Sequence, residues 1–284
     1  MKHCDGTLKG VRDSDIYYQG WRPEGEARAV LIIVHGLAEH SGRYMNLVRH
    51  FVPMGYAVCA FDHPGHGRSG GRRVYVRRFD DYTDTLHTVV ASIDEMVPGR
   101  PFFLIGHSMG GLIAAAYLID HPERFSGAVL SGPSIKASEN ISGAVIFTGK
   151  LLSALLPKAG LIALDASGVS RDAAVVDAYI QDSLVHHGKV TARLGAELLK
   201  AMKRVSAAAA GICLPLLILQ GAADRLVDPR GTQGFFEAAG SGDKTLKVYD
   251  GLYHEVFNEP EHGQVLLDVQ AWIEARLSEA RGDG

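Results

Sequence analysis

One serine lies where a hydrolytic nucleophile is expected. Ser108 is the centre of a Gly-x-Ser-x-Gly run, from Gly106 to Gly110, that follows an apolar segment and opens a helical one. This context is typical of a nucleophile elbow, a strained strand-to-helix turn that exposes the serine oxygen. A second match, centred on Ser69, follows a polar loop, so we expect Ser69 to be a loop residue. We therefore predict that Ser108 is the nucleophile; the alternative interpretation is a helix N-cap.

A serine is a weak nucleophile unless a general base lies beside it, and at an elbow of this kind the acid and the base follow the serine in the chain. His254 comes just after the last predicted strand, in the loop that would bring a base over Ser108. Asp224 comes just after the preceding strand, and Asp228 is the second choice for the carboxylate. The carboxylate would hold the imidazole tautomer and stabilise the imidazolium. Because the chain has 13 histidines, a surface loop is the alternative interpretation of His254.

Acyl transfer also needs backbone N–H groups aimed at the carbonyl oxygen that becomes negative. We expect one of these oxyanion-hole donors from Met109, the residue after the nucleophile, and the other from Leu37, in the loop after an earlier strand. His35 precedes Gly36 in that loop, and we expect it to shape the loop rather than to act as a base.

Short apolar segments that alternate with helical ones would position these residues. The predicted strands are 29–34, 57–62, 102–106, 127–131, 215–220 and 245–249, and the predicted helices are 42–53, 79–97, 109–121 and 260–280. This alternation predicts an α/β fold with a mostly parallel central sheet and helices on both faces.

The alternation stops between residues 132 and 214, where no strand is predicted. Helical patterns cover 141–156, 172–184 and 192–209 instead. We therefore predict one sheet domain, residues 1–133 and 208–284, interrupted by a helical cap, residues 134–207. The cap would lie over the carboxyl ends of the strands, where open α/β sheets bind their ligands.

Composition excludes several classes of protein. The 284 residues are 46% hydrophobic and 21% charged with a net charge of −3, which is typical of a soluble globular protein and argues against disorder and against a nucleic-acid partner. The three cysteines are too scattered for a disulfide framework or a zinc site. His63 and His66 have a His-x-x-His spacing without a third ligand nearby, so we expect them to be structural and predict no metal and no cofactor. The polar first residues and the lack of a long apolar run predict a cytoplasmic protein.

The loop after the first predicted parallel strand carries the most specific resemblance. Residues 35–44, His-Gly-Leu-Ala-Glu-His-Ser-Gly-Arg-Tyr, resemble the oxyanion loop of monoacylglycerol lipases, and 61–69, 106–111, 220–228 and 253–254 are similar to further loops of that family in the same order. The resemblance implies the α/β-hydrolase fold with a helical cap whose apolar face is turned to lipid. It also implies a serine hydrolase that cleaves monoacylglycerols to glycerol and fatty acid.

The same resemblance implies a polar subsite for glycerol. It would be lined by Glu39, Arg43, His107 and Tyr179. The alternative interpretations are a supporting ion pair between Glu39 and Arg43 and a packing role for Tyr179 in the cap. The chain departs from the family in residues 255–259, Glu-Val-Phe-Asn-Glu, where mammalian members carry a second histidine.

The expected partner is therefore a small lipid ester, and the apolar residues of the predicted cap favour peripheral contact with a membrane or lipid surface. A lysophospholipase or a short-chain carboxylesterase would use the same triad. A cofactor-free haloperoxidase would also use it, but the cap and the Glu39-His40 run argue against that reaction. A non-catalytic binding module would usually lack a triad member, and all three are present here. The sequence leaves the oligomeric state open.

Overall fold

A computed structural model describes residues 1–136 and 151–282 of the chain. Its centre is an eight-stranded sheet of order β1-β2-β4-β3-β5-β6-β9-β10. The strands are β1 (Lys2–Lys9), β2 (Asp15–Arg22), β3 (Val30–Val34), β4 (Ala57–Phe61), β5 (Phe102–His107), β6 (Gly127–Ser131), β9 (Leu216–Gly221) and β10 (Lys244–Tyr249). The strands from β4 to β10 in this order pair in parallel, whereas β1 and β2 are antiparallel. The predicted, mostly parallel sheet is thus confirmed.

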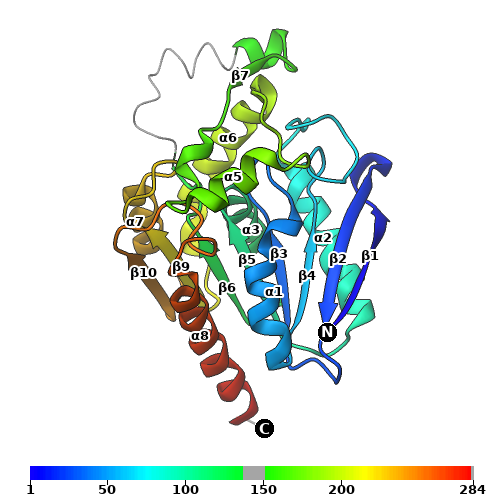
Figure 1. Cartoon of the computed structure of the whole chain (residues 1–284), viewed down its shortest axis with the longest axis vertical. Coiled ribbons are helices and arrows are strands. Elements are labelled where there is room, and N and C mark those ends of the chain that lie inside the picture. Colours follow the sequence, from blue (N-terminus) through cyan, green and yellow to red (C-terminus); the bar gives the residue numbers. More distant parts are fainter. Residues whose placement is uncertain (137–150, 283–284) are drawn as a thin grey trace.

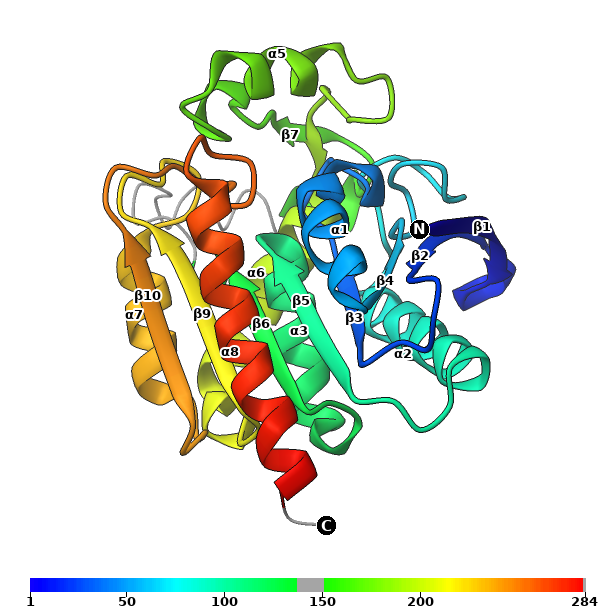
Figure 2. The ribbon, with the colours of Figure 1, turned by 60° about the horizontal axis from the view of Figure 1, so that its bottom comes forward.

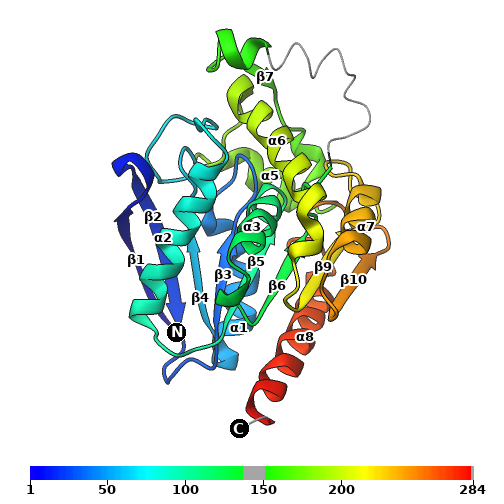
Figure 3. The same cartoon turned by 180° about the vertical axis from the view of Figure 1, so that it is seen from behind.

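Helices cover both faces of this sheet (Figures 1 and 3). One face carries α1 (Met45–Phe51) and α8 (His262–Gly282); the other carries α2 (Asp80–Met96), α3 (Met109–Asp120) and α7 (Pro229–Ala238). Short 3-10 turns occupy Val11–Asp13, Ser41–Tyr44, Val52–Met54, Pro122–Arg124, Ala166–Gly168 and Ala209–Gly211. All five residues of β3 are buried, as its uniformly apolar sequence requires of a strand covered on both faces. Two separate hydrophobic cores, one on each face, result from this layering.

The described residues between β6 and β9 lie partly above the carboxyl ends of the strands (Figure 2). They include β7 (Gly160–Ile162), α5 (Ala173–Gln181), β8 (Val190–Thr191) and α6 (Ala192–Ala208). Figure 2 shows α5 and β7 above those strand ends. The helix α6 instead runs along α3, and its buried Leu194, Leu198 and Val205 belong to the same core as α3. The predicted helices 172–184 and 192–209 correspond to α5 and α6, whereas most of the predicted helix 141–156 lies outside the described residues.

Four strands were not predicted from the sequence. The strand β1 is exposed along most of its length at the edge of the sheet, so it lacks the apolar run by which buried strands are recognised, and β2 follows it as its hairpin partner. The expectation of no strand between residues 132 and 214 is wrong, because β7 and β8 pair there. They have three and two residues, too few to give a periodic signal. Among the residues that the structure describes, no helix is both long enough and apolar enough to cross a membrane.

Candidate active site

Ser108 occupies the turn between β5 and α3. Its backbone has φ 54° and ψ −118°, a left-handed conformation that costs a non-glycine residue about 1–3 kcal/mol. Two hydrogen bonds hold this turn to the segment after β6, because Ser108 N donates to Ser131 O at 2.9 Å and Ser134 N donates to Ser108 O at 3.1 Å. A Cβ on Gly110 would lie 2.0 Å from Val34 O, so only glycine fits there. The local geometry is that of the predicted nucleophile elbow.

His254 and Asp224 form a buried pair beside this turn. His254 Nδ1 lies 2.8 Å from Asp224 Oδ2, and both side chains are almost fully buried. Asp228, the second choice, instead caps α7 by accepting from Arg230 N at 2.9 Å. Beneath the pair lies Gly132, with φ +48°, where a Cβ would stand 3.1 Å from His254 Nδ1. The strand-end loops therefore bring together the acid and the base that the sequence predicts.

The Asp224 carboxylate is fixed by three further donors. Its Oδ1 accepts from Leu226 N at 2.8 Å and from Val227 N at 2.9 Å, and its Oδ2 accepts from the Gln220 side-chain amide at 3.0 Å. Burial would raise the pKa of Asp224, but the histidine and the backbone N–H groups hold it below the ordinary value of 3.8. The carboxylate is therefore ionised at neutral pH and directed at His254.

The surroundings of His254 favour its protonated form. Burial alone would lower its pKa, but the Asp224 carboxylate, together with Glu255 and Glu39, raises the pKa of His254 above the ordinary value of 6.5. The neighbouring His107 has the opposite environment: burial and His254 lower its pKa to about 4, so it is neutral at pH 7. The two imidazole rings lie 4.6 Å apart between centroids, yet their pKa values are shifted in opposite directions.

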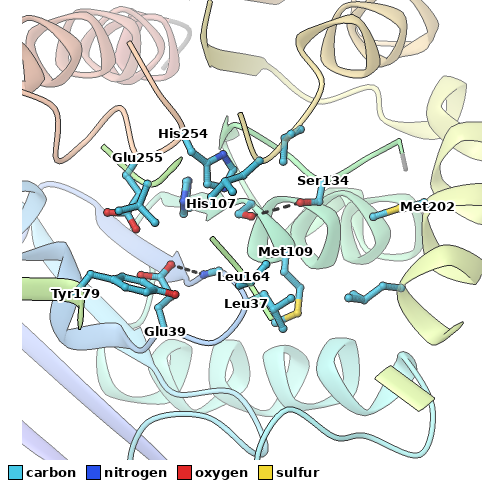
Figure 4. Close-up of a pocket in the computed structure, with 16 residues that line it drawn as sticks. Leu37, Glu39, His107, Met109, Ser134, Leu164, Tyr179, Met202, His254 and Glu255 are labelled. Carbon is cyan, nitrogen blue, oxygen red and sulfur yellow. Dashed lines mark hydrogen bonds between the residues drawn. The ribbon is translucent and has the colours of Figure 1, made fainter. Parts of the chain in front are cut away.

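A cavity of about 140 Å³ joins these groups (Figure 4). Its lining residues are Gly36, Leu37, Glu39, His107, Ser108, Met109, Ser134, Leu164, Val169, Tyr179, Leu198, Met202, Leu226, Val227, His254 and Glu255. In Figure 4, Glu39, Tyr179 and Glu255 lie on one side of His254, and Ser134 and Met202 lie on the other. Ser108 Oγ is 3.3 Å from Ser134 Oγ, its hydrogen-bond partner among the described residues. The cavity thus has a polar end and a largely apolar end.

The two predicted oxyanion-hole residues both line this cavity. Met109 is the first residue of α3, so its N–H has no acceptor within the helix. Leu37 lies in the loop after β3, where Ala38 adopts a positive φ of 67°. Glu39 braces that loop, because its Oε1 accepts from Gly36 N at 2.6 Å. The loop is therefore held in one strained conformation by a carboxylate that itself faces the cavity.

Three of the four residues that the resemblance assigns to the glycerol subsite line the cavity: Glu39, His107 and Tyr179. Arg43 does not belong to the described lining. It lies behind the cavity, where its guanidinium contacts Glu255 at 2.5 and 2.8 Å and Glu39 at 2.9 Å. The alternative interpretation of Glu39 and Arg43 as an ion pair therefore agrees with these contacts, and Glu39 also faces the cavity.

The residues expected to be structural make structural contacts. His63 is fully buried, donates from Nε2 to His35 O and donates from its backbone N–H to His35 Nε2, each at 3.0 Å. Ser69 donates to Asp62 O at 2.6 Å and accepts from Tyr17 N at 2.9 Å. Within residues 1–136 and 151–282, no group of three or more histidine, cysteine or acidic side chains is arranged to hold a metal ion.

Sequence reasoning missed three residues of this site. Glu255 appeared only as a departure from the family, and nothing in the sequence connects it with Arg43, 212 positions away. Gln220, which holds Asp224, lies in the apolar run of β9 and accepts from Thr232 through its own carbonyl. Ser134 follows Gly132 and Pro133 after β6, so a polar residue at a strand end was the available signal.

Comparisons with known proteins agree with this architecture. The profile of the family described as serine aminopeptidase, S33, matches residues 25–261. A monoacylglycerol lipase of Mycolicibacterium smegmatis is 41% identical over 97% of this chain and 98% of its own length. The human monoglyceride lipase is 37% identical over 93% of this chain and 88% of its own length. The crystal structure of Paleococcus ferrophilus monoacylglycerol lipase has a TM-score of 0.82 at 32% identity and covers 93% of this chain and 98% of that one. The predicted α/β-hydrolase fold is confirmed, and the chain belongs to the serine aminopeptidase S33 family of α/β-hydrolases and, within it, to the monoacylglycerol lipases.

Proposed function

We propose that this protein is a carboxylic ester hydrolase that cleaves monoacylglycerols to glycerol and free fatty acid. The observation that carries the proposal is the buried His254–Asp224 pair at 2.8 Å, whose histidine lines one cavity with the elbow serine Ser108. The polar end of that cavity suits a small alcohol and its apolar end suits an acyl chain. The kinship with monoacylglycerol lipases supports the same substrate class.

The reaction begins when the Ser108 hydroxyl turns from Ser134 towards His254. Its Oγ attacks the acyl carbon while His254 Nε2 accepts the proton, and Asp224 holds the Nδ1–H and stabilises the imidazolium. The backbone N–H groups of Leu37 and Met109 stabilise the oxyanion, and each donor contributes about 2.7–4 kcal/mol.

The bond between the acyl carbon and the glycerol oxygen then breaks, and His254 donates its proton to that oxygen. Glycerol leaves an acyl-enzyme on Ser108. Water then attacks the acyl carbon while His254 accepts its proton; the bond between the acyl carbon and Ser108 Oγ breaks, His254 returns the proton to Oγ, and the fatty acid leaves. No step of this proposed reaction requires a cofactor.

Substitution of Ser108 tests the assignment. We expect Ser108→Ala to lose at least about 1000-fold in kcat on an octanoyl ester and to lose labelling by a fluorophosphonate, because both need the Oγ nucleophile. Ser69→Ala is the matched control, since Ser69 carries the other Gly-x-Ser-x-Gly match and donates to Asp62 O in a loop. Labelling that persists in the Ser108 variant would refute the proposed nucleophile.

We further propose that residues 134–207 form the cap and that its exposed face contacts lipid. Leu155, Leu156 and Ile162 are 69%, 59% and 57% exposed, which is unusual for large apolar side chains near one another in the chain. The location that we propose is cytoplasmic, with reversible attachment to membranes. Fractionation of cells tests it: recovery of the protein only in an extracytoplasmic fraction would contradict this location.

A further inference from the structure

The guanidinium of Arg43 is held between two carboxylates. Nη1 and Nη2 donate to the two Glu255 oxygens at 2.5 and 2.8 Å, and Nη1 also donates to Glu39 Oε2 at 2.9 Å. The Tyr179 ring covers the group, with 4.6 Å between the guanidinium carbon and the ring centroid. A guanidinium binds phosphate through a planar fork of two N–H groups, and the Nη1–Nη2 fork of Arg43 is occupied by Glu255, so this fork is not available to an anionic substrate.

The carboxylates that occupy Arg43 face the cavity themselves. Glu39 and Glu255 both line it, and its described lining contains no lysine or arginine. Burial would raise the pKa of Glu255, but Arg43 holds it below the ordinary value of 4.5, so Glu255 is ionised at neutral pH. Two carboxylates with one guanidinium leave the polar end with a net negative charge, which the neutral His107 does not offset.

Each carboxylate retains acceptor capacity on the oxygen that contacts Arg43 Nη1. Glu255 Oε2 accepts from Arg43 and Asn258, and Glu39 Oε1 accepts from Gly36 N and from Tyr44, whereas Glu255 Oε1 and Glu39 Oε2 each accept only from Nη1 in the described structure. A carboxylate oxygen has room for about two hydrogen bonds. The polar end can therefore accept one more hydrogen bond at each of two neighbouring carboxylates.

We infer that Glu255, acting with Glu39, determines the specificity of the leaving-group site: it selects an uncharged alcohol with two free hydroxyls and excludes an alcohol that carries phosphate. This inference rests on the hydrolase activity proposed above and narrows its substrate class. Two hydroxyl donors match the two remaining acceptors, whereas a phosphate would meet two carboxylates and no lysine or arginine in the described lining of the cavity. The lysophospholipase alternative is thereby disfavoured for substrates whose leaving group is anionic.

Four esters of one acyl chain test this selection. We would measure kcat/KM for 1-octanoylglycerol, 1-octanoylglycerol 3-phosphate, octanoylcholine and p-nitrophenyl octanoate, all dispersed as monomers. The wild type is expected to cleave the glycerol ester at least about 100-fold faster than the phosphate ester, with the cationic choline ester closer to the glycerol ester. Added salt should raise kcat/KM for the phosphate ester and leave that for the glycerol ester unchanged, because salt screens the repulsion while the anionic substrate approaches the site through solvent.

The variant Glu255→Gln removes one charge from the site. With each kcat/KM divided by that for the nitrophenyl ester, the ratio of kcat/KM for the glycerol ester to that for the phosphate ester should fall by about tenfold or more in this variant. Asp250→Asn is the matched control, because it removes the same charge from an exposed turn four residues before His254, outside the described cavity lining. In this control, the ratio of kcat/KM for the glycerol ester to that for the phosphate ester should not change.

The outcomes separate the two proposals. A wild type that cleaves the phosphate ester within about threefold of the glycerol ester would overturn the inference and leave the hydrolase activity intact. The inference would also be overturned if the ratio of kcat/KM for the glycerol ester to that for the phosphate ester were the same in Glu255→Gln as in the wild type. If the Gln variant fails to fold, the salt dependence of the wild type decides the matter. Cleavage of the nitrophenyl ester alone would overturn the proposed function, and the inference with it.

Discussion

Gly221 connects the strand that leads to Asp224 with the loop that carries His254. It is the last residue of β9, and a Cβ placed on it would lie 2.1 Å from Tyr253 O and 2.5 Å from Leu252 O. Real Cβ atoms essentially never approach within 3.0 Å of another heavy atom, so Gly221→Ala must move the backbone of residues 252–253 by about 1 Å. Both neighbours are backbone carbonyls, which cannot rotate out of the way as a side chain can.

This displacement acts directly on the proposed triad. His254 follows Tyr253 in the chain, and its contact with Asp224 is 2.8 Å long, so a shift of about 1 Å breaks or misdirects it. Misplacement on this scale costs a catalytic group about 100-fold in rate, equivalent to about 2.7 kcal/mol. Overpacking of this kind also destabilises a fold by about 1–3 kcal/mol, which is a few degrees in Tm for a chain of this size.

The assay is kcat for p-nitrophenyl octanoate at 25 °C together with the Tm from calorimetry. Gly195→Ala is the matched control, because this glycine lies within α6 with nothing within 4 Å of its added Cβ. We expect the control to gain about 0.5–1 kcal/mol of stability, because alanine favours the helix, and to keep the wild-type kcat. A Gly221→Ala variant whose kcat stays within about threefold of the wild type would refute the steric coupling between the two loops.

Two further predictions concern the charge of the base and the exposed cap. His254 must be neutral to accept a proton and its pKa lies above 6.5, so kcat/KM should fall as the pH drops through that pKa. Because the Glu255 carboxylate contributes to the raised pKa, Glu255→Gln should move this fall in kcat/KM to lower pH. A pH profile of kcat/KM that is flat from pH 5 to 9 would contradict the assignment of His254 as the base. The double variant Leu155→Ser/Ile162→Ser should bind lipid vesicles at least about tenfold more weakly than the wild type in co-sedimentation, because each change removes exposed apolar surface from the proposed docking face. Leu267→Ser, which removes a 51% exposed leucine from α8, is its control, and equal binding of all three proteins would end the docking proposal.

The buried parallel strands could be predicted closely because they are largely apolar runs, whereas β10, with the sequence Lys-Thr-Leu-Lys-Val-Tyr, is a mixed and only partly buried strand. The predicted strand 127–131 coincides with β6, four of the other parallel strands differ from their predicted bounds by one residue at one end, and β9 is shifted by one residue at both ends. The predicted helix 42–53 proved to be a 3-10 turn, Ser41–Tyr44, followed by the short α1, Met45–Phe51, and a second 3-10 turn, Val52–Met54. Helix periodicity does not distinguish these cases, because a 3-10 turn buries the same apolar side chains.

The proposed triad was predictable for a related reason: each of its residues follows a recognisable strand, and parallel strands end at one edge of the sheet. The side-chain contacts around the proposed triad could not be predicted from the sequence. Ser134 reaches Ser108, and Gln220 reaches Asp224, through side-chain rotamers that depend on the assembled fold. Such supporting residues give no periodic signal in the sequence. Ser134 lies on a different element from Ser108, and Gln220 is a polar residue within an otherwise apolar strand.

Arg43 gives the two halves of the site a common support. Through Glu39 it is linked to Gly36 N–H in the loop that would supply one oxyanion donor, and through Glu255 it is linked to the residue next to His254. A buried cation flanked by two carboxylates is costly to rearrange, because moving either partner leaves a charge without compensation in a poorly hydrated interior. The ion-pair network therefore fixes the distance between the oxyanion loop and the base. The same network leaves the negative charge that, in our inference, selects the leaving alcohol. A substitution at Glu255 should therefore change both the position of His254 and the selectivity for the leaving alcohol.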